Sequence, residues 1–249
     1  MKKILNIFDL DKTLFFLKID YDKMRNELQK KTNSQNIFRP IVTTILSFDN
    51  SSELFDIMDK YELKSVSTAT IREVLFHYKE SIQNNKDNTY IITRNGLKLV
   101  KALFTKFNIL LPTEQNIFTR ETDITKQKTD KELVGLFNFK QTDNINYYGD
   151  SIHDVIFCTN IYNKFKCDII FYPPFWVHKK NKYGWKSKHF NSLKKIEINT
   201  SENIRLLRNM EKEIEFSNIP KNIGTSMEKS NLFIEQKNFI KSLYQNNFI

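Results

Sequence analysis

Short apolar segments alternate with helical patterns along most of the chain, and this alternation limits the folds that the sequence can adopt. The apolar segments are rich in Ile, Tyr and Phe, which favour strands, and they lie at 3–8, 89–93, 116–119, 145–148 and 168–172. Helical patterns separate the later segments, at 96–108, 129–139 and 154–165. A repeated strand, helix and strand indicate a mostly parallel sheet with helices on both faces. We therefore predict an α/β, Rossmann-like fold.

The segment between the first two predicted strands is much longer than an ordinary connection. It contains helical patterns at 21–31, 51–63 and 70–82, and Ser51 or Ser52 is the expected N-cap of the second helix. We expect residues 15–88 to form a helical subdomain over the C-terminal edge of the sheet, where ligands bind in open α/β folds. The catalytic core would then comprise residues 1–14 and 89–175.

Composition changes after residue 175. Residues 176–249 hold 14 of the 39 basic residues but only seven of the 29 acidic ones, and the whole chain has a formal net charge of +10. This basic C-terminal extension suggests an anionic partner. Its first part can bind nucleic acid through lysines on phosphates and an aromatic ring on bases, with Lys179, Lys180, Lys182, Trp185 and Lys186 as candidates. A solvated basic surface whose aromatic side chains pack on the core is the alternative.

Several classes of protein are disfavoured by what the sequence omits. No apolar run approaches the roughly 20 residues of a membrane span, and charge interrupts the apolar run at the start too early for a signal peptide. Cys158 and Cys167 fit neither a zinc site nor a disulfide framework. No glycine precedes Gly96, which excludes a glycine-rich nucleotide loop after the first strand. We expect a soluble, cytoplasmic protein.

Polar side chains, most of them acidic or hydroxyl-bearing, follow three of the predicted strands. Because the C-terminal ends of parallel strands meet at one edge of a sheet, we expect these side chains to gather there. They are Asp9, Asp11 and Thr13 after the first strand, Thr93, Arg94 and Asn95 after the second, and Asp150 and Asp154 after the fourth. Neighbouring carboxylates repel, so the first pair is costly unless a cation, a proton or a phosphate group uses it. A helix N-cap or an Asp-rich turn is the alternative for that stretch alone.

Together these residue types can assemble a phosphate-transfer site. Asp9 can attack phosphorus without prior deprotonation, and Asp11 can protonate the leaving oxygen and then deprotonate a water. Thr93 and backbone N–H groups at a helix start can donate to phosphoryl oxygens, with Thr13, Arg94 and Asn95 as further substrate contacts. Mg²⁺ prefers carboxylate and water oxygens, and its predicted ligands are Asp9, Asp11, Asp150 and Asp154.

In this order, the residues resemble the four motifs of the haloacid dehalogenase (HAD) superfamily of phosphohydrolases. DLDKTL at 9–14 resembles the first motif, IITRN at 91–95 the second, a lysine near Lys128 the third and YYGDSIHD at 147–154 the fourth. The resemblance covers about residues 1–172. It implies a Rossmann-like core, dependence on Mg²⁺ and an aspartyl-phosphate intermediate. The second acid, Asp11, resembles the phosphatase branches of the superfamily.

Two positions depart from the family pattern. Lys12 stands where relatives often have Gly, and the third-motif lysine is open among Lys126, Lys128 and Lys131. We favour Lys128 as the catalytic lysine because it directly precedes a helical pattern. The insertion at 15–88 is similar to a helical cap of the first type, which excludes water and selects the substrate.

The function predicted from these observations is Mg²⁺-dependent hydrolysis of a small phosphorylated metabolite or nucleotide. A phosphatase that processes the ends of polynucleotides is the alternative, with the basic 176–195 segment holding the nucleic acid. A catalytically silent binding module of the same fold is a third hypothesis, which the intact set of acids disfavours.

Overall fold

A mostly parallel sheet forms the centre of the molecule in the computed structural model, which describes residues 3–33, 41–45, 48–72, 74–122, 133–140, 143–172 and 196–197. Its strands are β1 (Ile4–Phe8), β4 (Thr89–Ile92), β5 (Ile117–Phe118), β6 (Asn144–Tyr148), β7 (Asp168–Tyr172) and β8 (Ile196–Glu197). The order is β5-β4-β1-β6-β7-β8, and only β8 runs antiparallel to its neighbour. The predicted α/β fold is confirmed, and all five predicted strands are present.

Helices connect these strands. Along the chain they are α1 (Tyr21–Thr32), α2 (Ile41–Ile45), α3 (Ser51–Val66), α4 (Val74–Asn84), α5 (Leu97–Lys106) and α6 (Ile152–Phe165). Within the described ranges, three short 3₁₀ helices lie at Lys86–Asn88, Glu114–Asn116 and Leu133–Leu136. Two short strands, β2 (Phe15–Phe16) and β3 (Thr70–Ile71), form an antiparallel pair outside the main sheet. None of the helices in the described ranges is both long and apolar enough to cross a lipid bilayer.

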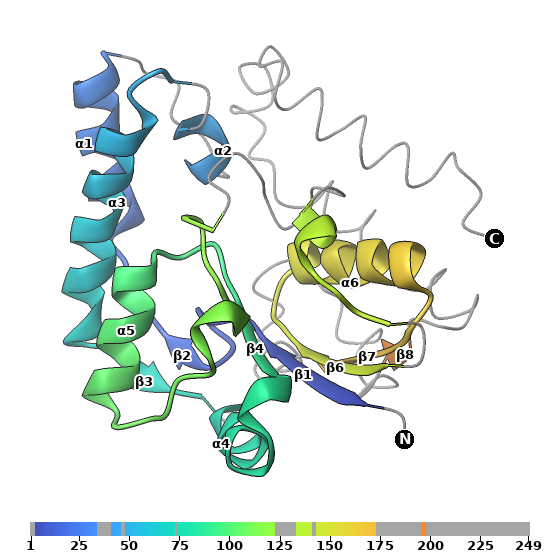
Figure 1. Ribbon diagram of the computed structural model, residues 1–249. Helices are drawn as coiled ribbons and strands as arrows, with labels where there is room; N and C mark the ends of the chain where they lie inside the picture. Colours follow the sequence, from blue (N-terminus) through green and yellow to red (C-terminus); the bar gives the residue numbers. More distant parts are fainter. Residues whose placement is uncertain are drawn as a thin grey trace, which may run out of the picture.

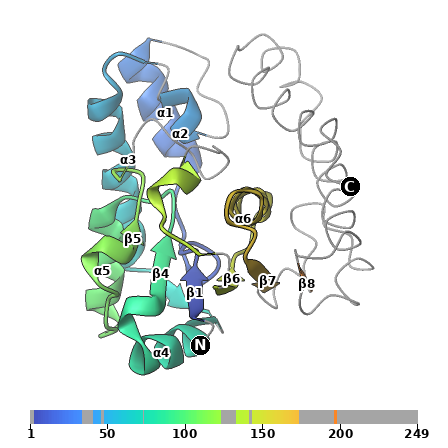
Figure 2. The same cartoon turned by 45° about the vertical axis from the view of Figure 1, so that its right-hand side comes forward.

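Helices cover both faces of the sheet. Successive side chains of a strand point to opposite faces, so each strand contributes to the core on both sides. Phe8 and Ile91 pack in one apolar cluster with buried residues of α4 and α5. The preceding residue of β1, Ile7, and the following residue of β4, Ile92, belong to a second cluster with α6. Figures 1 and 2 show α4 and α5 on one side of the sheet and α6 on the other. The strands are therefore buried on both faces, which explains their continuous apolar sequences.

The chain between β1 and β4 holds the inserted helices, by which we mean α1, α2 and α3. Helix α3 packs against both α1 and α5. Helix α4 falls within the insertion predicted at 15–88, but it contacts β1 and β4 of the sheet. In space it therefore lies with the sheet, while β2 and β3 pair where the chain leaves and re-enters the sheet region.

Three local expectations were wrong. Helix α3 has Asn50 rather than Ser51 or Ser52 as its N-cap. The pattern at 70–82 is divided, because Thr70–Ile71 pairs as β3 before α4 begins at Val74. In the pattern at 129–139, the described part forms only a 3₁₀ turn and then a segment without regular secondary structure. That segment carries Phe137 and Phe139, both buried, whose rings stack on each other. Their spacing of two suits an extended chain and not a helix.

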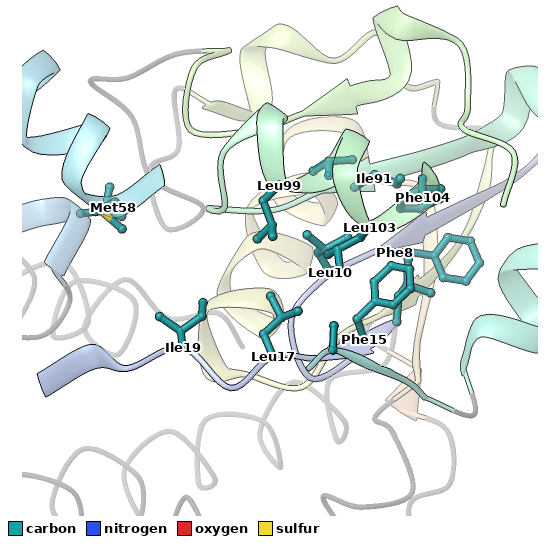
Figure 3. Packing of buried hydrophobic residues seen from close by; sticks show 14 of the residues in the cluster. Phe8, Leu10, Phe15, Leu17, Ile19, Met58, Ile91, Leu99, Leu103 and Phe104 are labelled. Atoms are coloured by element: carbon teal, nitrogen blue, oxygen red, sulfur yellow. The ribbon is translucent and has the colours of Figure 1, made fainter. Parts of the chain in front are cut away.

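Apolar side chains fix the segment that follows β1. Leu10 and Leu14 are fully buried, and the backbone N–H groups of Leu14 and Phe15 both donate to the carbonyl of Leu10. Figure 3 shows Leu10 and Leu17 beside Leu99 and Leu103 of α5, within one apolar cluster. This packing holds the turn in place, so the polar residues between the leucines are presented on a rigid support.

Candidate functional site

Three carboxylates meet at the C-terminal edge of the sheet. Asp9, Asp150 and Asp154 each place one oxygen within 4.8 Å of the others, and all three side chains are buried. The topology explains the meeting: the connection that follows β1 leads to β4 on one side of it, and the connection that follows β5 crosses to β6 on its other side. Such a point of divergence forms the ligand crevice in open α/β folds. Phe8 is in register with Tyr148, which brings the residues after β1 and β6 to the same level.

The electrostatics of this cluster favour a bound cation. Burial raises the pKa of Asp150 well above the ordinary carboxyl value, and the charges of Asp9 and Asp154 raise it further. The buried acids therefore disfavour one another's ionised form unless positive charge lies among them. Carboxylate oxygens are the protein ligands that Mg²⁺ prefers. This set of donors fits a divalent cation held by Asp9, Asp150 and Asp154.

Asp154 is fixed by its neighbours. The hydroxyl of Tyr147 donates to its Oδ1 (2.9 Å), and the backbone N–H and hydroxyl of Ser151 donate to its Oδ2 (3.0 and 2.7 Å). These contacts include a capping box at the start of α6. A Cβ atom on Gly149 would lie 2.6 Å from Asp154 Cγ, so only glycine allows this close approach. The segment at 147–154 therefore holds Asp154 in one orientation beside Asp150.

Asp11 is the predicted ligand that is absent from the three-carboxylate group. Its Oδ1 accepts a hydrogen bond from the backbone N–H of Leu17 (3.2 Å), and its Oδ2 lies 3.9 Å from Lys12 Nζ. These contacts explain why its carboxylate is held apart from the others. Burial raises the pKa of Asp11 to about 6, against the opposing charge of Lys12 and with a further rise from Asp9. A carboxyl with this pKa can exchange a proton near neutral pH.

Lys12 adopts a left-handed backbone conformation, with a φ angle of 67°. Its backbone N–H donates to the carbonyl of Phe15, which closes the turn after β1. Glycine adopts such a conformation at little cost. This geometry gives a physical reason why the position that Lys12 occupies often holds Gly in the family that the sequence resembles.

The 93–96 loop, which joins β4 to α5, carries the hydroxyl of Thr93. This hydroxyl donates to Asn95 Oδ1 (3.0 Å) and accepts from the backbone N–H of Asn95 (3.2 Å). Strand β4 pairs with β1, so Thr93 follows the strand next to the one that ends before Asp9. Arg94 Nη1 is buried and has no hydrogen-bond partner among the described residues. The same is true of Thr13 Oγ1. These groups are available to an anion bound at this edge.

Residues of the inserted helices also reach the 93–96 loop, and the sequence analysis missed them. Glu62 of α3 is 2% exposed and hydrogen-bonds both Asn95 and Arg120. Its sequence signal was available, because Glu62 lies at helical spacing from the buried residues Leu54 and Met58 of α3. A carboxylate on the apolar face of a helix is costly to bury unless a buried partner pairs with it. Tyr21, at the start of α1, is another residue of the inserted helices that the sequence did not single out: burial raises its pKa, and the charge of Asp11 raises it further.

Other predicted residues lie outside the part of the chain that the structure describes. They are the three candidate lysines of the third motif and the predicted nucleic-acid contacts, namely Lys126, Lys128, Lys131, Lys179, Lys180, Lys182, Trp185 and Lys186. Most of the basic extension at 176–249 falls outside it as well, with only β8 described. The roles of these residues stay predictions.

Comparison with solved structures finds proteins similar to this chain. CbbY from Rhodobacter sphaeroides in complex with phosphate is 12% identical, with 71% of this chain and 88% of that chain covered and a TM-score of 0.47. A HAD-superfamily hydrolase from Ehrlichia chaffeensis is 14% identical (70% and 88% covered, TM-score 0.39). Another, of subfamily IA, variant 1, from Geobacter sulfurreducens, is 12% identical (70% and 89% covered, TM-score 0.40). No family model matches the chain, and no curated protein matches it.

Proposed function

We propose that the chain is a Mg²⁺-dependent phosphomonoester hydrolase of the HAD type that acts on a small phosphorylated metabolite or nucleotide. The observation that supports this proposal is the meeting of Asp9, Asp150 and Asp154 at the C-terminal edge of the sheet. Asp9 carries the proposed nucleophile, and the neighbouring strand ends in the hydroxyl-bearing 93–96 loop. The inserted helices would serve as the cap that selects the substrate.

The proposed reaction has two steps, and in both Asp9 and Asp11 have distinct roles. In the first, an Asp9 oxygen forms a bond to phosphorus while the bond to the leaving oxygen breaks, and Asp11 gives that oxygen its proton. In the second, water attacks the aspartyl phosphate, Asp11 takes the proton from this water, and Asp9 is released with inorganic phosphate. The pKa of about 6 suits Asp11 to both transfers. Mg²⁺, when bound by the buried carboxylates, would supply positive charge beside the phosphoryl oxygens.

The phosphate group would be oriented by donors of the 93–96 loop. The Thr93 hydroxyl and the buried Arg94 Nη1 lie in this loop, and α5, which begins directly after it, adds the positive end of its dipole. Lys128 remains our proposed third-motif lysine. Such donors stabilise charge on the phosphoryl oxygens as the transition state forms.

Turnover of p-nitrophenyl phosphate by the full chain tests this function. We expect release of p-nitrophenol with Mg²⁺ present and none after EDTA treatment, with recovery when Mg²⁺ is restored. A panel of nucleoside monophosphates and sugar phosphates, compared with 5′-phosphorylated oligonucleotides over a range of salt, then tests the substrate class. Small substrates should show little dependence on salt, whereas a steep loss with salt and a preference for oligonucleotides would favour the polynucleotide alternative.

Replacing Asp11 with Asn should affect the two half-reactions differently. An alkyl phosphate needs a proton on its leaving oxygen, so we expect kcat to fall by about 10²–10⁴-fold. Because p-nitrophenolate leaves without a proton, the first step should survive with p-nitrophenyl phosphate and the second should be slow. Rapid mixing should then show a burst of one p-nitrophenol per active site. A matched control is Asp22→Asn, at a side chain that is 87% exposed on α1. Equal losses for both substrates without a burst would contradict the role of Asp11.

A further inference from the structure

Glu62 accepts three hydrogen bonds, two of which connect the inserted helices to the 93–96 loop. Asn95 Nδ2 and the backbone N–H of Gly96 each donate to its carboxylate (both 3.1 Å), and Arg120 Nη1 donates as well (2.8 Å). Glu62 comes from α3, whereas Asn95 and Gly96 directly precede α5, so one carboxylate joins segments that are far apart in the sequence. We propose that Glu62 is a positioning residue that orients Thr93 for phosphate binding, an inference that rests on the proposed phosphatase function.

The orientation of the Asn95 amide is the first step of this argument. A carboxylate accepts hydrogen bonds and cannot donate them, so Glu62 selects the amide orientation that presents Nδ2. The amide oxygen then points the other way and accepts the proton of the Thr93 hydroxyl (3.0 Å). The opposite orientation would place Asn95 Oδ1 against the buried charge of Glu62. Glu62 therefore fixes the position of the Thr93 hydroxyl oxygen through one intervening side chain, and the hydroxyl proton turns from Asn95 Oδ1 to a phosphoryl oxygen when phosphate binds.

Arg120 allows a charged carboxylate to occupy this buried position. Burial raises the pKa of Glu62, and the charge and hydrogen bond of Arg120 lower it, as do the hydrogen bonds from Gly96 and Asn95. The Arg120 side chain is itself only 2% exposed and also contacts Asp59 of α3. A Cβ atom on Gly96 would lie 2.6 Å from Arg120 Nη2, so glycine makes room for the guanidinium. A buried ion pair adds little net stability, and a role in orientation gives a reason for its presence.

The rest of α3 is held on α5 by further contacts. Lys98 Nζ lies 2.9 Å from Asp59 Oδ2, and Lys106 Nζ donates to the carbonyls of Val66 and Ser67 at the C-terminal end of α3 (2.6 and 2.9 Å). A cation at that end also complements the helix dipole. Helix α3 is therefore fixed beside α5 over much of its length, which keeps the Glu62 carboxylate at the start of α5. Docking of the insertion and orientation of the phosphate donor are thus linked.

A double-mutant cycle between Glu62 and Thr93 tests the inference. Glu62→Gln keeps the side-chain shape but removes the acceptor-only property, and we expect kcat/KM for p-nitrophenyl phosphate to fall by about 10²-fold, as for other misplaced catalytic groups. In a Thr93→Ala background the same change should cost less than about threefold, because there is no hydroxyl left to orient. Glu53→Gln, at an exposed side chain of the same helix, is the matched control. Equal losses in both backgrounds would show a merely structural role and overturn the inference.

Two further measurements keep the result interpretable. Should Glu62→Gln not fold, Asn95→Ala removes the same connection without touching the ion pair, and it should show the same dependence on the Thr93 hydroxyl. Binding of inorganic phosphate, measured by calorimetry, gives a readout that needs no turnover, and Glu62→Gln should weaken it while Glu53→Gln should not. Wild-type protein without turnover would refute the phosphatase function alone. Turnover and phosphate binding that are unchanged in Glu62→Gln would refute the positioning role alone.

Discussion

Replacing Asp9 with Asn is expected to abolish phosphomonoester turnover while the protein stays folded. An amide is a far weaker nucleophile than a carboxylate, and the change also removes one donor of the buried carboxylate cluster. We expect kcat to fall by on the order of 10⁴-fold or more, as when the nucleophile of a covalent mechanism is removed. Steady-state kinetics with p-nitrophenyl phosphate and Mg²⁺ measure this loss. Circular dichroism and thermal unfolding verify the fold.

The covalent intermediate gives this prediction a second test. In the Asp11→Asn variant the second step is slow, so a phosphate adduct on the protein should accumulate and be visible by intact-mass spectrometry after acid quench. The adduct should disappear when Asp9→Asn is added to the same variant. The exposed Asp22→Asn serves again as the control and should keep wild-type rates. Turnover in Asp9→Asn that equals the wild-type rate would remove the proposed mechanism.

Replacing Asp150 with Asn is expected to change stability in opposite directions with and without metal. Without metal, the variant loses a buried charge that Asp9 and Asp154 disfavour. We expect its free energy of unfolding to exceed that of the wild type, because a neutral amide removes the repulsion among the three buried carboxylates. With Mg²⁺ at about 100 times its Kd, the wild type should gain about 2.7 kcal/mol. The variant should gain little, because it lacks one charged ligand.

Urea unfolding at fixed pH, with EDTA or with Mg²⁺, measures both effects in one series. Asp56→Asn, at an exposed side chain of α3, is a control that should respond to Mg²⁺ like the wild type. Wild type and Asp150→Asn that gain equally from Mg²⁺ would show that the cation binds elsewhere. A metal-free Asp150→Asn that is less stable than the wild type would show that the buried carboxylates are not in conflict.

The sequence alone determined the order of the sheet elements along the chain and which strand ends carry acids. Buried strands need continuous apolar residues, so all five predicted strands were recognisable from composition. Because parallel strands end at a common edge, Asp9 and Asp150 could be expected near each other, and the structure places them together. Local sequence patterns predicted the structure less well where a short strand pairing replaced part of a predicted helix, as at Thr70–Ile71.

Only the tertiary structure decided which partners surround the acids. Asp11 was expected in the same group as Asp9, but the turn after β1 directs its carboxylate to the backbone N–H of Leu17. Glu62 and Arg120 are 58 residues apart in the sequence, and their hydrogen bond exists because α3 packs against α5. Spacing rules describe neighbours on one helix or one strand, whereas a contact between elements depends on how their surfaces dock. The identity of the acids could therefore be predicted from the sequence, but the network that orients the 93–96 loop could not.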